Sequence, residues 1–182
     1  MIKVFDNLFD QKWVSWLASQ LVTSESWTTS NVANRKTWPH RETGSHRLFG
    51  TLYFERKNED VIYYGGGQGV RNELVAAFDF LRKSLKLNLL LTEICSNLQF
   101  MGMDGTTHND GKENEVSFIL MLCNEDLPKN IGGEFYHQPT HKKYPFKNGR
   151  LIQITASDPH FAYAFKKPHL ARVSIKFVGT LR

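Results

Sequence analysis

The chain lacks the features that mark several classes of protein. It has only two cysteines in 182 residues, too few for a disulfide framework. No window is apolar for long enough to span a membrane, and Asp6, Asp10 and Lys12 interrupt the first apolar run before it reaches the length of a signal peptide. It also has no repeat, linker or low-complexity tract. We therefore expect one soluble, cytoplasmic domain over residues 1–182, without membrane contact.

The composition is that of a globular protein with an aromatic and basic bias. The 13 Phe and 4 Trp residues suit strands and pockets, and the 41% hydrophobic content argues against disorder. The net charge is +5, and many basic residues lie in segments that we expect to be loops: Arg35, Lys36, Arg41, Arg47, Lys142, Lys143, Lys147 and Arg150. Such loops attract nucleic acid or an acidic protein, although a solvated basic surface explains them more simply.

Hydrophobic spacing predicts two helices in the first half of the chain. Trp13, Trp16, Leu17 and Leu21 recur at helical intervals behind Asp10, a suitable N-cap, so one face should pack on a sheet. The segment RNELVAAFDFLRKSLKL repeats this pattern after a run of glycines. No Gly-Lys-Ser/Thr follows those glycines, so a flexible turn is expected there rather than a phosphate loop.

The rest of the chain consists of short apolar segments separated by turn sequences. NEVSFILMLC, RLIQITAS and ARVSIKFVG are typical of strands, and DGTT, NEDLPKNIGG and KNG are typical of turns. Two helices followed by about eight strands predict an all-β core with flanking helices, a sandwich or jelly roll with the helices packed on one sheet. Residues 1–90 are expected to form a helical and loop support region, and residues 91–180 the jelly-roll core.

The stretch GTTHNDGKENEVSF places His108 and Asp110 two positions apart, just before a predicted strand. Residues i and i+2 of an extended chain point to the same face, so this imidazole and this carboxylate can converge on one ion. Such a pair occurs by chance in roughly one chain in three of this composition, so a third ligand is required. A ferrous centre that activates oxygen uses two neutral imidazoles and one carboxylate on one face.

The third ligand should come from a later strand. The candidates are His137, His141, His160 and His169. His160 fits best because it begins a strand directly after a turn, as a ligand at the rim of a barrel would. Taken alone, His160 is better explained as a surface or strand-end histidine with an ordinary hydrogen bond.

The last predicted strand, ARVSIKF, alternates apolar and polar residues. One face therefore suits the helices, and the other face, which bears Arg172, Ser174 and Lys176, would carry Arg172 and Ser174 inward. A buried arginine is costly unless an anion accompanies it. A guanidinium holds a carboxylate with two parallel hydrogen bonds, and the Ser174 hydroxyl can add a third. A carboxylate ligand is predicted here, and an internal ion pair of Arg172 is the alternative.

Taken together, HND, SFILMLCNEDLPKNIGGEF, NGRLIQITASDPH and ARVSIKF resemble the iron(II)- and 2-oxoglutarate-dependent dioxygenases, particularly the small prolyl-4-hydroxylase-like branch. The resemblance covers residues 98–177. It implies a double-stranded β-helix, a jelly-roll form, and an enzyme that hydroxylates an unactivated C–H bond while 2-oxoglutarate is converted to succinate. The implied cofactors are Fe(2+), 2-oxoglutarate and O₂, with ascorbate as an additional reductant.

The resemblance also implies roles for particular residues. His108, Asp110 and His160 would be the catalytic iron ligands, and Arg172 with Ser174 would hold the far carboxylate of 2-oxoglutarate. Two departures bear on the substrate. Arg172 follows His160 by twelve positions, a little more than the family usually shows, and the branch often has a lysine in its place. The tyrosine that the branch usually has near position 99 or 100 is also missing.

The expected substrate is a protein or peptide side chain, with proline as one option. A free amino acid or small metabolite comes second, and a nucleic acid third, because the last strand lacks the Arg-x-Asn-x-Thr-x-Arg pattern of AlkB-type demethylases. Arg35, Trp38 and His40 are expected to contact the substrate from a loop that closes over the site, with a plain surface loop as the alternative. The alternative to an oxygenase is a cupin-like jelly roll that binds a metal ion but has no oxygenase activity.

Overall fold

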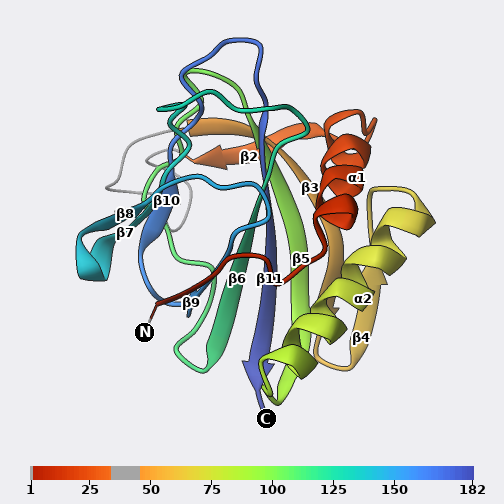
Figure 1. The fold of residues 1–182 in the computed structure, drawn as a ribbon. Coiled ribbons are helices and arrows are strands. Elements are labelled where there is room, and N and C mark those ends of the chain that lie inside the picture. The colour runs from red at the N-terminus through yellow and green to blue at the C-terminus, as the bar shows by residue number, and fades with distance from the viewer. Residues whose placement is uncertain (1, 34–45) are drawn as a thin grey trace.

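The computed structural model describes residues 2–33 and 46–182, which form two β-sheets and two α-helices (Figure 1). The elements of the first ninety residues are β1 (Lys3–Phe5), α1 (Gln11–Val22), β2 (Thr28–Ala33), β3 (His46–Lys57), β4 (Asp60–Tyr63), α2 (Gln68–Ser84) and the start of β5 (Leu89–Gln99). The later elements are β6 (Glu115–Leu122), β7 (Phe135–His137), the 3₁₀ turn η1 (Gln138–Thr140), β8 (Lys142–Tyr144), β9 (Leu151–Thr155), β10 (His160–Ala162) and β11 (Arg172–Leu181).

The strands form a large and a small sheet, and every strand pair is antiparallel. The large sheet has the order β1-β9-β6-β11-β5-β3-β2, with β4 added to β3, and the small sheet has the order β10-β7-β8. Strands that are distant in sequence pair repeatedly, as β5 does with β11, which is typical of sandwich and jelly-roll topologies. The prediction of a mostly β core with flanking helices is therefore confirmed.

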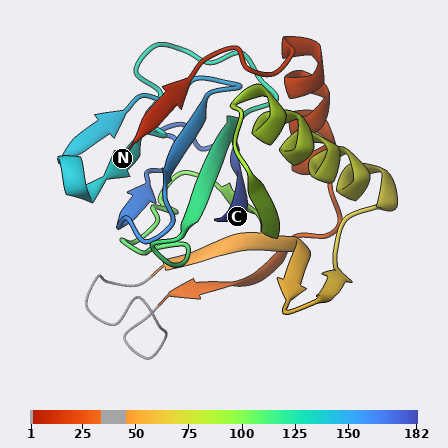
Figure 2. The same ribbon diagram turned by 90° about the horizontal axis from the view of Figure 1, so that it is seen from below.

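The first ninety residues contribute strands as well as helices. β1 pairs with β9, and β3 pairs with β5, so both extend the sheet that the later strands form. The division at residue 90 therefore does not coincide with a boundary between layers. Figure 2 shows β2 and β3 continuing the large sheet beyond β5.

The two helices cover one face of the large sheet (Figures 1 and 2). The predicted N-cap is present, since the Asp10 carboxylate accepts hydrogen bonds from the main-chain N–H groups of Lys12 and Trp13 at 2.9 and 3.1 Å. Leu17 is fully buried, but Trp16 is 41% exposed, so the expectation that Trp16 shares the packed face is wrong. Trp16 therefore lies on the helix surface outside the buried stripe that faces the sheet.

The buried stripes of the helices pack on alternate residues of the central strands. The helical residues are Val14, Leu17, Ala18, Leu21, Leu74, Ala77, Phe78 and Leu81. On β11 they meet Val173, Ile175 and Phe177, each with no exposed surface. The alternation predicted for this strand is therefore confirmed, and its other face is left for the space between the sheets.

A second, smaller apolar cluster joins the two sheets. Ile119 and Met121 of β6 point away from the helices and pack with Phe135 of β7. The small sheet thus lies on the face of the large sheet opposite the helices. Both cysteines are free thiols. No helix in residues 2–33 and 46–182 is long and apolar enough to cross a membrane.

Candidate functional site

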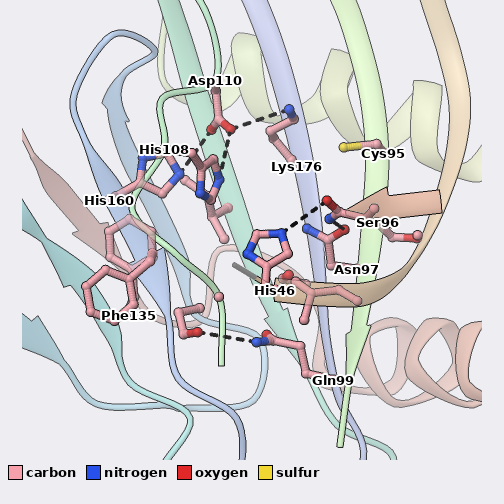
Figure 3. A pocket seen from close by; sticks show the side chains of 18 of the residues that line it. His46, Cys95, Ser96, Asn97, Gln99, His108, Asp110, Phe135, His160 and Lys176 are labelled. Atoms are coloured by element: carbon pink, nitrogen blue, oxygen red, sulfur yellow. Dashed lines mark hydrogen bonds and ion pairs between the residues drawn. The ribbon is translucent and has the colours of Figure 1, made fainter. Parts of the chain in front are cut away.

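A cavity of about 340 Å³ lies between the two sheets (Figure 3). The large sheet contributes residues of β2, β3, β5, β6 and β11, and the small sheet contributes residues of β7 and β10. The loop between β5 and β6 closes the cavity with His108 and Asp110. Polar side chains therefore reach the cavity from several segments that are far apart in sequence.

His108, Asp110 and His160 come together at this cavity. One ligand atom from each residue lies within 4.8 Å of those of the other two. The main chains of His108 and His160 form a two-hydrogen-bond bridge, with N···O distances of 3.0 and 2.9 Å, so the loop is joined to β10. Directly paired residues of an antiparallel bridge place their side chains on the same face, and the imidazole centroids are 4.6 Å apart.

Main-chain carbonyl groups fix the orientation of both imidazoles. His108 Nδ1 lies 2.8 Å from the Thr106 carbonyl oxygen, and His160 Nδ1 lies 2.8 Å from that of Asp158. Because a carbonyl oxygen only accepts, each Nδ1 carries a proton, and Nε2 faces Asp110, at 3.7 Å from Oδ1 for His108 and 3.4 Å from Oδ2 for His160. Burial, with the neighbouring His160, lowers the pKa of His108 to about 4, so this ring is neutral at pH 7.

Asp110 is an ionised carboxylate held by groups from two strands. Its side chain is 2% exposed, and the hydroxyl of Ser117 donates to Oδ2 at 2.5 Å. Lys176 Nζ lies 3.4 Å from Oδ1 and 2.7 Å from Oε1 of Glu93. Burial works to raise the pKa of Asp110, but Lys176, foremost among several groups, holds it well below its ordinary value.

Lys176 and its partners had no predicted role. Burial works to lower the pKa of the Lys176 ammonium, but the carboxylates of Asp110 and Glu93 keep it well above its ordinary value. The alternation of ARVSIKF already placed Lys176 on the inward face of the last strand, which is the signal that identified Arg172. Nothing local to Glu93 or Ser117 indicated that they would meet this lysine or Asp110.

Arg172 is fully buried beside the cavity. Its Nε donates to the Gly133 carbonyl oxygen at 3.1 Å, and its Nη1 donates to Gln99 Oε1 at 2.8 Å. Nη2 has no hydrogen-bond partner in the part of the chain that the structure describes. Burial lowers the pKa of Arg172 to about 10. Among the described residues no carboxylate forms an ion pair with Arg172, so the internal pair considered above is not observed.

The cavity itself is lined by Ser174 and Gln99, while Arg172 lies behind Gln99. The expected fork of two parallel hydrogen bonds is therefore partly occupied, because two of the guanidinium nitrogens already serve neutral protein acceptors. Gln99 occupies the region where the prolyl-4-hydroxylase-like branch usually has a tyrosine. Its amide orients the arginine, a function that sequence reasoning did not assign.

The other histidine candidates lie outside the cluster. His137 is buried and contacts Asp158 Oδ2 at 3.1 Å and Thr140 Oγ1 at 2.9 Å. It thereby supports the residue whose carbonyl orients His160. His141 and His169 are exposed.

The predicted substrate contacts Arg35, Trp38 and His40 lie outside the described residues. The structure therefore leaves their role as a prediction.

No protein-family model matches the chain, and no curated protein matches it by sequence. Solved structures do match. An oxidoreductase of the 2OG-Fe(II) oxygenase family from Burkholderia pseudomallei has a TM-score of 0.71 and 12% identity, over 98% of this chain and 84% of that one. A Pseudomonas putida prolyl-4-hydroxylase has a TM-score of 0.67 and 16% identity, over 100% and 92%. HygX from Streptomyces hygroscopicus, with nickel, 2-oxoglutarate and hygromycin B bound, has a TM-score of 0.65 and 12% identity, over 99% and 82%.

These likenesses establish the fold. The chain has the fold of the 2OG-Fe(II) oxygenases, and its structural neighbours include prolyl-4-hydroxylases, as the resemblance implied. At identities of 12 to 16% they do not transfer an activity or a substrate.

We expect Lys176→Met to lower the free energy of unfolding by about 3 kcal/mol, because it leaves the Asp110 carboxylate buried without its main cation. Asp110 has a lowered folded-state pKa, so its contribution is present above its unfolded pKa of about 3.9 and is lost as the pH falls. The difference from the unmodified protein should therefore be large at pH 7 and shrink below about pH 4. Urea denaturation of the metal-free protein at several pH values measures it.

Lys57→Met is the matched control. Lys57 pairs with Glu55 at 3.0 Å, but its side chain is 61% exposed, so this substitution should leave the unfolding free energy nearly unchanged. If both variants lost the same free energy of unfolding, the buried ion pair of Lys176 and Asp110 would contribute no more to stability than an exposed one.

Proposed function

We propose that this chain is an Fe(II)- and 2-oxoglutarate-dependent dioxygenase on a double-stranded β-helix, which hydroxylates an unactivated C–H bond of a protein or peptide side chain, proline included. One observation carries the proposal. Two imidazoles and one carboxylate from separate segments meet at a cavity between the sheets of a 2OG-Fe(II) oxygenase fold.

The donor set suits ferrous iron. His108 and His160 each turn Nε2 toward Asp110, and Asp110 presents an ionised oxygen, so the three residues match the two-histidine, one-carboxylate set of non-haem Fe(II) oxygenases. The hydrogen bonds from each Nδ1 to a carbonyl oxygen are the outer contacts that orient metal-ligating histidines. Ser117 orients Asp110 in the same way. The carboxylate at position 110 also favours hydroxylation over halogenation, because halogenating relatives carry a small residue there.

The surroundings of Arg172 suit a dicarboxylate cosubstrate. Among the described residues its Nη2 is buried without a partner, a costly state that a carboxylate oxygen would relieve once the Gln99 side chain moves aside. Ser174, two residues further along the same face of β11, offers its hydroxyl at the cavity surface. We assign these two residues to the far carboxylate of 2-oxoglutarate.

When bound, iron with 2-oxoglutarate and O₂ would supply the oxidation, in which the cosubstrate loses CO₂ and becomes succinate, with one oxygen atom of O₂ entering succinate and the other entering the substrate. The chain's own residues hold and shield these groups. Lys176 and Ser117 keep Asp110 ionised and oriented. Phe135, whose ring stacks on His160 at 5.2 Å, and Ile119 restrict water on the small-sheet side of the cavity.

A peptide is the leading substrate class because a prolyl-4-hydroxylase is among the most similar structures. A small molecule is the second candidate, and one observation favours it. HygX, with hygromycin B bound, matches this chain with a nearly equal TM-score.

The first test of the function is succinate formation from 2-oxoglutarate by the iron-loaded protein in the presence of ascorbate. We expect His108→Ala to reduce this turnover by about 100-fold or more. Mutating the hydrogen-bond partner of a metal ligand typically reduces metal affinity or activity by about 10- to 100-fold, and removing the ligand itself should cost more. Calorimetry with Mn(II) should show a matching loss of metal affinity. His169→Ala, the same change at an exposed histidine, should alter neither quantity. Metal affinity that survives in His108→Ala would remove the ligand assignment.

The second test concerns the cosubstrate pocket. Arg172→Ala should raise the Kd of the Mn(II)-loaded protein for 2-oxoglutarate by about 10- to 100-fold, because hydrogen bonds to charged groups contribute about 1.5–3 kcal/mol. Ser174→Ala leaves the core intact and should raise the same Kd by about 2- to 10-fold. Arg82→Ala, on the surface of α2, is the control. An unchanged Kd in Arg172→Ala would show that 2-oxoglutarate binds elsewhere.

The third test concerns the substrate. Proline-containing peptides and a metabolite extract are incubated separately with the iron-loaded protein, and mass spectrometry records any gain of one oxygen atom. We expect the gain on a peptide, and none with His108→Ala. A gain confined to a metabolite would replace the peptide by the second candidate.

A further inference from the structure

The β2, β3 and β5 side of the cavity carries polar side chains that the proposed reaction does not use. Asn31 of β2, His46 of β3 and Asn97 of β5 all line the cavity. Figure 3 shows Asn97 on the β5 side of the cavity, across from His160, with His46 between them. None of the three has a place in binding iron or the far carboxylate of 2-oxoglutarate.

The two amides meet across the intervening strand. Asn31 Nδ2 donates to Asn97 Oδ1 at 2.6 Å, although β3 lies between β2 and β5. They pass over Gly50, which is paired in register with Asn97. A Cβ at position 50 would lie 3.1 Å from the Asn31 Cβ, so glycine leaves the room that the bridge requires. The bridge is therefore built into the sheet.

One main-chain N–H sets the direction of the whole chain of hydrogen bonds. The Thr106 N–H donates to His46 Nδ1 at 2.9 Å, so that nitrogen has no proton and Nε2 carries it. His46 Nε2 then donates to Asn31 Oδ1 at 3.4 Å. This leaves the Asn31 nitrogen facing Asn97, whose oxygen accepts. The Asn97 nitrogen is left to face the cavity, and it has no partner among the described residues.

The Asn97 nitrogen thus offers neutral N–H donors on this side of the cavity. Lys176, the ammonium that lines the cavity, is already engaged by Asp110 and Glu93, so it does not offer an open cation to an anionic substrate. Asn97 is paired in register with Ser174, so its amide lies next to the proposed cosubstrate site.

We propose, on the basis of the function proposed above, that Asn97 and Asn31 form a donor subsite that binds an acceptor oxygen of a neutral polar substrate, either an amide carbonyl or a hydroxyl. The subsite selects for an oxygen that accepts hydrogen bonds and against a group that only donates them. Asn97 is the residue that determines this specificity, because its oxygen is held by Asn31 and its two N–H bonds remain for the ligand.

The test uses small probes and the metal-free protein, labelled with ¹⁵N. N-Methylacetamide supplies a carbonyl oxygen, ethylene glycol supplies hydroxyl oxygens, and methylammonium supplies only donors. We expect the side-chain amide signal of Asn97 to shift with at least one of the two neutral probes and to stay in place with methylammonium. The larger of the two shifts tells whether the natural acceptor is a carbonyl or a hydroxyl.

Two variants make the test specific. Asn97→Asp keeps the oxygen that accepts from Asn31 but replaces the donor nitrogen by oxygen, so it identifies the signal and should weaken binding of the effective probe by about tenfold or more. Asn72→Asp makes the same change on the exposed surface of α2 and should leave the affinity unchanged. If Asn97→Asp does not fold, Asn97→Ala serves in its place.

The donor subsite is overturned if neither neutral probe moves the Asn97 signal, or if methylammonium moves it equally. The outcome is separate from the proposed oxygenase function because no iron or 2-oxoglutarate is present. A protein that binds the probes but forms no succinate would keep the donor subsite and lose the reaction. A protein that forms succinate but whose Asn97 signal does not shift with either neutral probe would keep the reaction and lose the donor subsite.

Discussion

The candidate site depends on a carboxylate that is buried and charged. Asp110 has only 2% of its side chain exposed, and a buried anion is tolerated only when cations and donors surround it. Lys176 from β11 supplies the cation and Ser117 from β6 supplies a donor, and the Nε2 atoms of His108 and His160 lie beside the same carboxylate from the loop and from β10. The same compensation that stabilises Asp110 draws together the segments that make a metal-binding geometry.

The period of the β-strand explains how one short segment serves both packing and chemistry. On β11 the apolar residues pack under the helices, while Ser174 and Lys176 face the cavity from the opposite side. A shift of one residue in register would exchange these faces, burying Lys176 in the helix layer and exposing the core residues between the sheets. The two pairings of β11, with β5 and with β6, therefore position the site as well as stabilise the fold.

Much of the architecture could be predicted because it follows from local patterns. The 3.6-residue and two-residue periods identified both helices and the two faces of the last strand, and the Asp10 cap followed from residue type. The pairing of β1 and β3 with later strands could not be predicted, since sheet order is a long-range choice to which many strand sequences are equally suited. The exposure of Trp16 could not be predicted either. The rotation of the helix about its axis relative to the sheet, which is set by tertiary packing, decides which edge of its apolar stripe is buried.

The sequence by itself determined the chemical types of the groups at the site: two imidazoles, a carboxylate two residues from one of them, and an inward arginine on the last strand. Only the tertiary structure decided how they are satisfied. The bridge between His108 and His160, the Gln99 and Gly133 acceptors of Arg172, and the ion pairs of Lys176 each join residues from different segments. Period and residue type act over a few positions along the chain, whereas a hydrogen bond or ion pair across the cavity depends on distances that are fixed only when the sheets close on each other.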